Sequence, residues 1–174
     1  LCAKQVVGDD PFAVILADDL ISAKPGTLRQ MVDLYNHYRC SVIGVQNVAP
    51  EETGSYGIVK GSMVAPRIHK MEAIVEKPRP ENAPSNMAVV GRYILTPRIF
   101  TLLEKIPRGA GSEIQLTDGI AALLAYEAVY AYEFEGKRYD CGSKLGYLQA
   151  TVEYALMHPE LKDKFREYLK KFPL

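Results

Sequence analysis

Short, mainly apolar runs alternate with segments of helical periodicity along most of this chain. Residues 12–17 (FAVILA) and 40–48 (CSVIGVQNV) are runs of this kind, which is typical of strands buried on both faces of a sheet. Between them, the apolar residues from Leu28 to Tyr38 recur at spacings of three and four, which places them on one face of a helix that Thr27 can cap. Strand, helix and strand in this order predict a βαβ unit.

The middle of the chain has a different pattern. Residues 54–64 and 67–78 have mixed polarity, which suits a more exposed antiparallel pair joined by a turn. After a proline-rich loop, the pattern predicts a buried strand at 87–95, a helix at 96–106 with Thr96 as cap and Pro97 in first position, a glycine-rich loop at 107–113, a helix at 114–127, a strand at 129–136, and helices at 144–158 and 159–172. We therefore expect one α/β domain over residues 1–174, with a mixed, mostly parallel sheet covered by helices.

Composition narrows the class of protein. The 174 residues are 48% hydrophobic and 24% charged, which gives enough apolar area for a core. Because 21 basic residues balance 21 acidic ones, net charge does not point to nucleic acid, and the apolar runs are shorter than the roughly 18 residues of a membrane span. The three scattered cysteines, Cys2, Cys40 and Cys141, favour reduced thiols and a cytoplasmic protein.

Two adjacent carboxylates, Asp18 and Asp19, follow the first apolar run. Ligands of α/β sheets bind beyond the carboxyl ends of strands, and Mg²⁺ prefers carboxylate, phosphate and water oxygens, so this is a candidate metal site. The alternative is that these acids accept turn or cap hydrogen bonds from backbone N–H groups. Since an unpaired charge is expensive to bury, at least one of them needs a cation or several donors.

A second group of candidates lies between residues 54 and 78. Glu76 and Lys77 end a strand just before the proline loop, where a lysine could bind a phosphate and a glutamate could accept hydrogen bonds from sugar hydroxyls. Side chains of successive strand residues point to opposite faces, so the two need not pair, and both could equally be solvated charges. The glycines of GSYG, which include Gly57, allow either a turn or the close approach of a ligand.

The remaining polar clusters have structural explanations. Ser112 with Gln115 fits a helix capping box, and Asp118 in the same first turn suits the helix dipole. In the RYDCGS segment, Asp140 and Gly142 precede a helix that Ser143 can cap, which we interpret as structural. The histidines have no metal-ligand spacing, and the chain has no Walker A, G-x-G-x-x-G or G-x-S-x-G motif.

The order of these segments carries more information than any one of them. In sequence, PFAVILADDLI, GSYGIV, VEKPRPENAPSNMAVVGRYILTPRIF, GSEIQLTDGIAALL and YEFEGKRYDCGSKLGYLQATVEYAL resemble the bacterial UTP–glucose-1-phosphate uridylyltransferases, a family of sugar nucleotidyltransferases, over nearly the whole chain. The resemblance implies a Rossmann-like fold and a Mg²⁺-dependent reaction in which glucose 1-phosphate attacks the α-phosphorus of UTP in line, giving UDP-glucose and pyrophosphate. Catalysis would then consist mainly of positioning and charge neutralisation.

The resemblance also implies roles for individual residues. Asp18 matches the metal-binding acid, Glu76 the acid that holds glucose hydroxyls, and Lys77 the lysine on the phosphate. Four further matches are Gly57 against the sugar, and Val89, Val90 and Gly91 on the strand beside it. Asp118 matches an acid that serves the metal in related nucleotidyltransferases.

The chain departs from the family pattern in two places. It lacks the glycine-rich segment that binds nucleotide phosphates, so we expect an N-terminally incomplete domain that is inactive by itself, and Ala17 stands where the family usually has a proline. An exposed sheet edge would favour association, so we also expect a homo-oligomer, a dimer or tetramer. Two alternatives stay open: a metal-dependent glycosyltransferase that uses a nucleotide sugar, and a non-catalytic sugar-phosphate-binding module.

Overall fold

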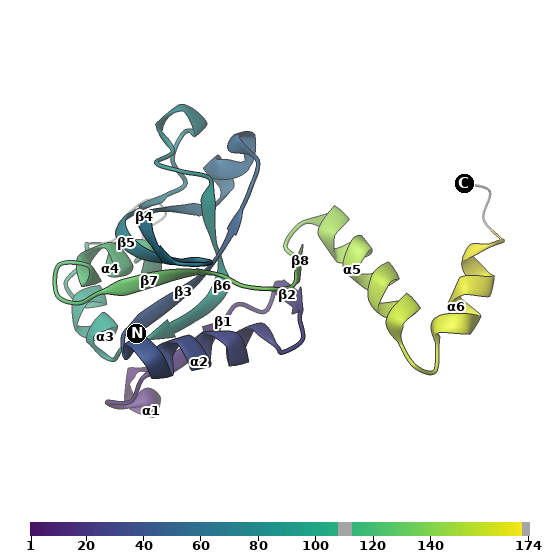
Figure 1. Ribbon diagram of the computed structural model, residues 1–174, viewed down its shortest axis with the longest axis horizontal. Helices are drawn as coiled ribbons and strands as arrows, with labels where there is room; N and C mark the ends of the chain where they lie inside the picture. The colour runs from purple at the N-terminus through teal and green to yellow at the C-terminus, as the bar shows by residue number, and fades with distance from the viewer. Residues whose placement is uncertain (108–112, 172–174) are drawn as a thin grey trace.

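The computed structural model describes residues 1–107 and 113–171, and its main element is a six-stranded sheet (Figure 1). The strand order is β1-β6-β3-β7-β5-β4, and a separate two-stranded sheet pairs β2 with β8. The strands are β1 (Phe12–Ile15), β2 (Asp19–Ser22), β3 (Ser41–Asn47), β4 (Gly57–Ala65), β5 (Ile68–Glu76), β6 (Met87–Leu95), β7 (Val129–Glu133) and β8 (Lys137–Asp140). The α-helices are α1 (Lys4–Val7), α2 (Thr27–Tyr38), α3 (Arg98–Leu103), α4 (Leu116–Leu123), α5 (Lys144–Met157) and α6 (Lys162–Leu169), and two 3₁₀ turns are η1 (Pro50–Ser55) and η2 (Pro80–Asn82).

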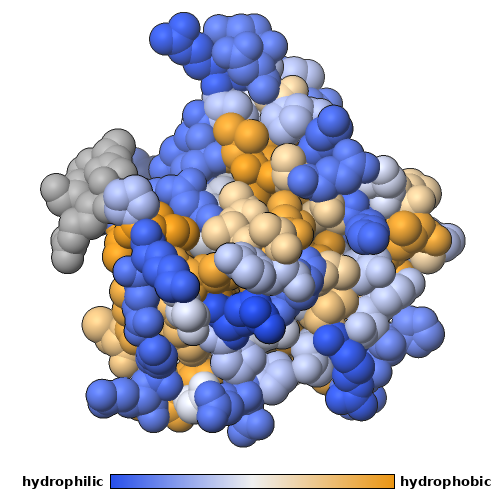
Figure 2. All heavy atoms as spheres, turned by 90° about the vertical axis from the view of Figure 1, so that its left-hand side faces the viewer, coloured by the Kyte–Doolittle hydropathy of each residue, from blue (hydrophilic) through white to orange (hydrophobic). Residues whose placement is uncertain are grey.

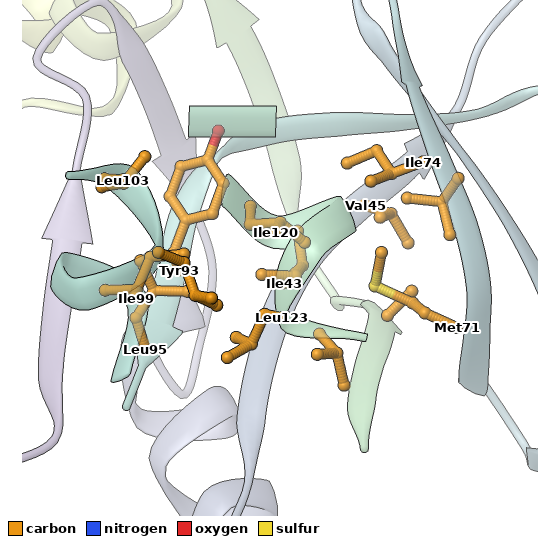
Figure 3. Close-up of a cluster of buried hydrophobic side chains, with 14 of the residues drawn as sticks. Ile43, Val45, Met71, Ile74, Tyr93, Leu95, Ile99, Leu103, Ile120 and Leu123 are labelled. Atoms are coloured by element: carbon orange, nitrogen blue, oxygen red, sulfur yellow. The ribbon is translucent and has the colours of Figure 1, made fainter. Parts of the chain in front are cut away.

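Helices cover both faces of the large sheet, as the sequence predicts. On one face, α3 and α4 pack against the sheet and enclose the larger core cluster, which includes Ile43, Val45 and Leu95 (Figure 3). On the other face, α2 packs Met31 against Val42 and Ile94. Alternate residues of β3 and β6 thus point to opposite faces, and β3 is buried on both because it lies in the middle of the sheet.

The predicted mixed sheet is confirmed, but the expectation that it is mostly parallel is wrong for the described strands. Of their pairings in the large sheet, β3–β7 is parallel and the rest are antiparallel. The two strands of the expected βαβ unit, β1 and β3, run in the same direction, but β6 lies between them and is antiparallel to both. A strand from much later in the chain therefore occupies the position where a direct β1–β3 pair was expected.

The first apolar run is also less buried than its composition suggests. Phe12 and Val14 are half-buried, whereas Ala13 and Ile15 are exposed, because β1 lies at the end of the strand order. The strand stops at Ile15, and the acid pair lies at the junction with β2, which begins at Asp19. The acids therefore connect the large sheet with the small one.

Helix caps agree with the sequence in one case and differ in two. The Ser143 hydroxyl caps α5 by accepting a hydrogen bond from the Gly146 N–H. Thr27 is the first residue of α2 rather than its cap, and its hydroxyl has no hydrogen-bond partner among the described residues. Thr96 donates its hydroxyl to Glu127 on another segment, so α3 begins after Pro97 without a side-chain cap that the structure describes.

The last two helices form an arm that extends from the small sheet away from the large one (Figure 1). Gly146 and Ala150 of α5 are buried, while Leu145, Leu148 and Met157 are more than half exposed. On the end of the molecule opposite this arm, apolar residues lie in the middle of a face with hydrophilic side chains around them (Figure 2). None of the helices in the described part of the chain is long and apolar enough to cross a membrane.

Candidate functional site

A cavity of about 420 Å³ opens where the acid pair, the end of β5 and the first turn of α4 meet. Segments far apart in the sequence contribute to it, because the end of β1, the start of β4, the middle of β6 and the end of β8 converge there. Its lining residues are Leu16, Asp18, Asp19, Ser55, Tyr56, Gly57, Glu76, Lys77, Val89, Gly91, Tyr93, Gln115, Leu116, Thr117, Arg138 and Asp140.

Asp18 and Asp140 bring two carboxylates to one side of this cavity. The Asp18 side chain is exposed, and the Asp18 carbonyl accepts a hydrogen bond from the Cys141 N–H, which holds the two segments together. A Cβ atom added to Gly142 would lie 3.1 Å from both Asp18 Oδ2 and Asp140 Oδ1. The two acids therefore flank the same small space beside Gly142.

Asp19 faces into the protein and forms a buried ion pair. Its Oδ2 accepts a 2.8 Å hydrogen bond from the Gly91 N–H, and its Oδ1 accepts one from Arg138 Nε. A Cβ atom at Gly91 would lie 2.7 Å from Asp19 Oδ2 and 2.5 Å from Leu16 Cβ, so the close approach of β6 to the acid requires glycine there. Asp19 thus has the supporting role that the turn alternative predicts, although its partners lie on distant strands.

Arg138 links this ion pair to Tyr56 and Asp140. Its Nη1 donates to the Tyr56 hydroxyl at 3.4 Å, and its Nη2 lies 3.5 Å from Asp140 Oδ2. Burial disfavours the charged guanidinium, but the hydrogen bonds to Tyr56 and Asp19 and the charge of Asp19 outweigh it, so the pKa of Arg138 lies above its ordinary value. One buried cation therefore orients an aspartate on either side of it.

Glu76 and Lys77 bring opposite charges to the same cavity. Glu76 ends β5, and its Oε1 lies 3.9 Å from Lys77 Nζ, while its Oε2 accepts a hydrogen bond from the Thr117 hydroxyl. Strand alternation would send these neighbours to opposite faces, but Lys77 lies just beyond β5 with φ of 41°, in the left-handed region. The turn brings both side chains to one cavity, and the Lys77 N–H donates to the Tyr56 carbonyl at 3.0 Å.

Tyr93 connects this cavity to the main core. Its ring packs among the apolar side chains of the larger cluster, and its hydroxyl points away from Leu95 and Leu123 (Figure 3). Burial raises the pKa of Tyr93 to about 12, with smaller contributions from the charges of Asp19 and Glu76. The phenol is therefore neutral at physiological pH and can donate a hydrogen bond into the cavity.

Most of the site residues that the sequence predicts lie together. Six line this cavity: Asp18, Gly57, Glu76, Lys77, Val89 and Gly91. Val90 does not line it, because alternation along β6 turns its side chain to the other face, where Cγ2 would lie 3.4 Å from a Cβ atom on Gly44. Asp118 is exposed on α4 and does not line the cavity either, although its neighbour Thr117 does.

Several polar lining residues were not predicted as site residues from the sequence, among them Tyr56, Tyr93, Thr117, Arg138 and Asp140. Asp140, like Asp18, is an acid at the end of a strand, but that strand, β8, was not predicted, and RYDCGS was interpreted as structural. Thr117 has no such signal, because its importance depends on a contact with Glu76, 41 residues earlier. The predicted capping box begins at Ser112, which lies outside the described residues.

The carboxylates of Asp18 and Asp140 suit a hard divalent cation. Asp18 and Asp140 supply carboxylate oxygens beside a shared space, and Mg²⁺ commonly takes one or two carboxylates together with phosphate oxygens and water. Over residues 1–107 and 113–171, no group of three or more His, Cys, Asp and Glu side chains could hold a metal by itself. A cation here would therefore need oxygens from a ligand or from water.

Comparison with known proteins identifies relatives over most of the chain. The family model for nucleotidyl transferases matches residues 1–156. The chain is 51% identical over 153 residues to the UTP–glucose-1-phosphate uridylyltransferase of Pseudomonas aeruginosa, which covers 87% of this chain and 55% of that protein. It is 47% identical over 169 residues to the Bacillus subtilis enzyme of the same name, covering 97% of this chain and 58% of that one.

Solved structures agree with the fold. A structure of UDP-glucose pyrophosphorylase in complex with UDP-glucose matches with a TM-score of 0.85 and 45% identity, over 87% of this chain and 59% of that one. A UTP-bound UGPase from Acinetobacter baumannii matches with a TM-score of 0.87 and 42% identity, over 99% of this chain and 60% of that one. The Rossmann-like fold is therefore confirmed, and the chain spans between half and two thirds of the length of these relatives.

Proposed function

We propose that this chain, which belongs to the nucleotidyl transferase family, forms the sugar-phosphate and metal-binding part of a UTP–glucose-1-phosphate uridylyltransferase. The reaction joins UTP and glucose 1-phosphate to give UDP-glucose and pyrophosphate. A phosphate oxygen of the sugar attacks the α-phosphorus of UTP, and pyrophosphate leaves. The ligands named for the related structures, UDP-glucose and UTP, support this choice of substrates.

The observation that carries the proposal is that Glu76 and Lys77 line the same cavity as Asp18 and Asp140. Glu76 accepts hydrogen bonds from the sugar hydroxyls, and the Lys77 ammonium neutralises the phosphate. Gly57 and Gly91, without side chains, and Val89 shape the space between them. Because in-line phosphoryl chemistry requires little beyond positioning and charge neutralisation, this set of groups suffices for the sugar-phosphate half.

Mg²⁺ is the cofactor that we assign to the acid side, with Asp18 as its principal ligand and Asp140 as the second carboxylate. When bound, the ion neutralises negative charge on the phosphates as the leaving group departs. The exposed Asp118 is a weaker candidate, because it does not line the cavity and α4 is held by Ile120 and Leu123 in the apolar core. Arg138 and the Tyr56 hydroxyl hold Asp140 Oδ2, while the Gly142 N–H donates to Asp140 Oδ1.

Further parts of the proposal concern the setting of the enzyme. The whole enzyme works in the cytoplasm as a homo-oligomer, for which the scattered cysteines and the exposed apolar residues of α5 are the supporting observations. The chain by itself is expected to be inactive, because it lacks the glycine-rich nucleotide loop.

A grafted enzyme tests the activity. Residues 1–174 replace the matching segment of the Bacillus subtilis relative, and pyrophosphate release from UTP and glucose 1-phosphate is measured with and without Mg²⁺. We expect Mg²⁺-dependent turnover from the graft and none from the chain alone. In the graft, Lys77→Ala should lower kcat/KM about 100-fold, as loss of a charge-stabilising group does, whereas Lys60→Ala, outside the cavity, should leave it unchanged.

The same assay separates the alternatives. Transfer or hydrolysis of UDP-glucose without pyrophosphate formation would identify a glycosyltransferase instead. Sugar-phosphate binding without turnover or Mg²⁺ dependence in the graft would indicate a non-catalytic module. Either result would overturn the proposed activity.

A further inference from the structure

The Thr117 hydroxyl contacts Glu76, the residue to which we assign the sugar hydroxyls. Thr117 is in the first turn of α4 and lines the cavity, and its hydroxyl donates to Glu76 Oε2 on β5. The Glu76 side chain is half-buried, and the hydrogen bond from Thr117 crosses from the helix layer to the sheet. A charge-assisted bond of this kind is among the stronger side-chain hydrogen bonds, so it restricts the orientation of the carboxylate.

Glu76 has a competing partner within reach. Lys77 Nζ lies 3.9 Å from Glu76 Oε1, which is the outer limit of an ion pair. If the carboxylate turned toward this ammonium, the two groups that face the cavity with opposite charges would neutralise each other. Both would then be less available to a ligand that carries hydroxyls and a phosphate.

Thr117 and Glu76 both pack closely against Gly57. A Cβ atom on Gly57 would lie 3.3 Å from Glu76 Oε2, 3.4 Å from Thr117 Cγ2 and 3.6 Å from Thr117 Oγ1. Both branches of the Thr117 side chain therefore lie beside the start of β4, and its hydroxyl reaches the carboxylate from there. Because Gly57 has no side chain, all three residues fit together at the cavity wall.

We propose that Thr117 is a positioning residue for sugar binding, which holds the Glu76 carboxylate away from Lys77 so that one carboxylate oxygen remains free for sugar hydroxyls. Thr117 acts through Glu76 and does not contact the reacting atoms. The inference rests on the proposed function, since it assumes that Glu76 binds a sugar and Lys77 its phosphate.

Binding to the 174-residue chain tests the inference without requiring turnover. Isothermal titration with glucose 1-phosphate compares the wild type with Thr117→Val, which keeps the shape and removes the hydroxyl, and Thr117→Ser, which keeps the hydroxyl. We expect Thr117→Val to weaken glucose 1-phosphate about 10-fold, the usual effect of losing one hydrogen bond to a charged group, and Thr117→Ser to stay within about 3-fold of the wild type. Thr151→Val, on α5 outside the cavity, is the matched control and should have no effect.

Inorganic phosphate serves as the second probe because it has no sugar hydroxyls. If Thr117 only supported the fold, Thr117→Val would weaken phosphate and sugar phosphate alike and would lower the melting temperature. The inference requires that the loss be specific to the sugar phosphate and be rescued by serine. Equal glucose 1-phosphate affinities for the wild type and Thr117→Val would overturn the inference alone, whereas a wild type that binds no glucose 1-phosphate would overturn the proposed function as well.

Discussion

The two walls of the cavity are built by different physical means. The sugar wall, defined here as Gly57, Glu76, Lys77 and Thr117, belongs to the large sheet and to α4, which covers it. The acid wall, defined as Asp18, Asp19, Arg138 and Asp140, belongs to the two-stranded sheet of β2 and β8 and the turns next to it. The first is supported by an extensive apolar core, the second by a buried ion pair.

The supporting core of the sugar wall is largely apolar. Ile120 and Leu123 of α4 pack with Ile43 of β3 in the same buried cluster, so α4 has little freedom to shift (Figure 3). Single polar contacts on this wall therefore adjust side-chain direction, and their removal should change ligand affinity more than stability.

The acid wall has little apolar support. Tyr139 is the buried hydrophobic residue of β8, and Ser22 and Lys137 at the other end of the small sheet are half-buried and exposed. Its shape depends on Arg138, which contacts Asp19, Tyr56 and Asp140 at once. Changes to this network should therefore affect stability and site geometry together, and this contrast can be tested.

The largest effect should come from Arg138→Met. It leaves Asp19 buried and without its cation, and breaking a buried ion pair in this way usually costs about 3–5 kcal/mol. Urea denaturation of the variant and the wild type would measure this loss of unfolding free energy. The matched control is Arg166→Met, which removes an exposed ion pair on α6 and should cost less than about 1 kcal/mol.

A double variant shows whether the unpaired charge is the cause. Asp19→Asn combined with Arg138→Met keeps a side-chain acceptor for the Gly91 N–H but leaves no buried charge. We expect it to be more stable than Arg138→Met alone. A double variant that is destabilised by the sum of the single changes would contradict the view that the acid wall depends on this ion pair.

A smaller effect is expected from Tyr93 at alkaline pH. The folded-state pKa of about 12 exceeds the usual value near 10, so the contribution of the neutral phenol to stability is complete below pH 10 and is lost as the pH rises toward 12. Compared with Tyr93→Phe, the wild type should lose about 2 kcal/mol of unfolding free energy between pH 9 and 12.

The control for this substitution is Tyr147→Phe, because Tyr147 is 59% exposed on α5. A pH-independent difference between the wild type and Tyr93→Phe would mean that the Tyr93 phenol is not held in its neutral form by the site.

The sequence predicts the sugar wall better than the acid wall. Glu76, Lys77 and Gly57 stand at a strand end and a strand start that the polarity pattern indicates, and the family resemblance assigns their roles. The pattern failed for β2 and β8, because four residues are too few to establish a period and neither strand is a continuous apolar run as β1 is. Because these two strands were not predicted, nothing in the sequence indicated that Asp140 and Arg138 lie beside Asp18.

The remaining errors have a common cause in long-range pairing. The apolar run from Phe12 predicts a strand but not its neighbour, and the choice of β6 over β3 depends on a segment about 80 residues later. Similarly, the left-handed backbone of Lys77 turns its side chain to the same cavity as Glu76, against the alternation of an ideal strand. Tertiary contacts decide both features, and a local pattern contains neither.

The most direct test of the account is a crystal structure of the chain with glucose 1-phosphate and Mg²⁺. We expect sugar hydroxyls on the Glu76 carboxylate, the phosphate within hydrogen-bond distance of Lys77 Nζ, and the ion on Asp18. A sugar phosphate bound elsewhere, or bound in this cavity with its phosphate turned away from Lys77, would contradict the proposal that this wall is the sugar-phosphate site.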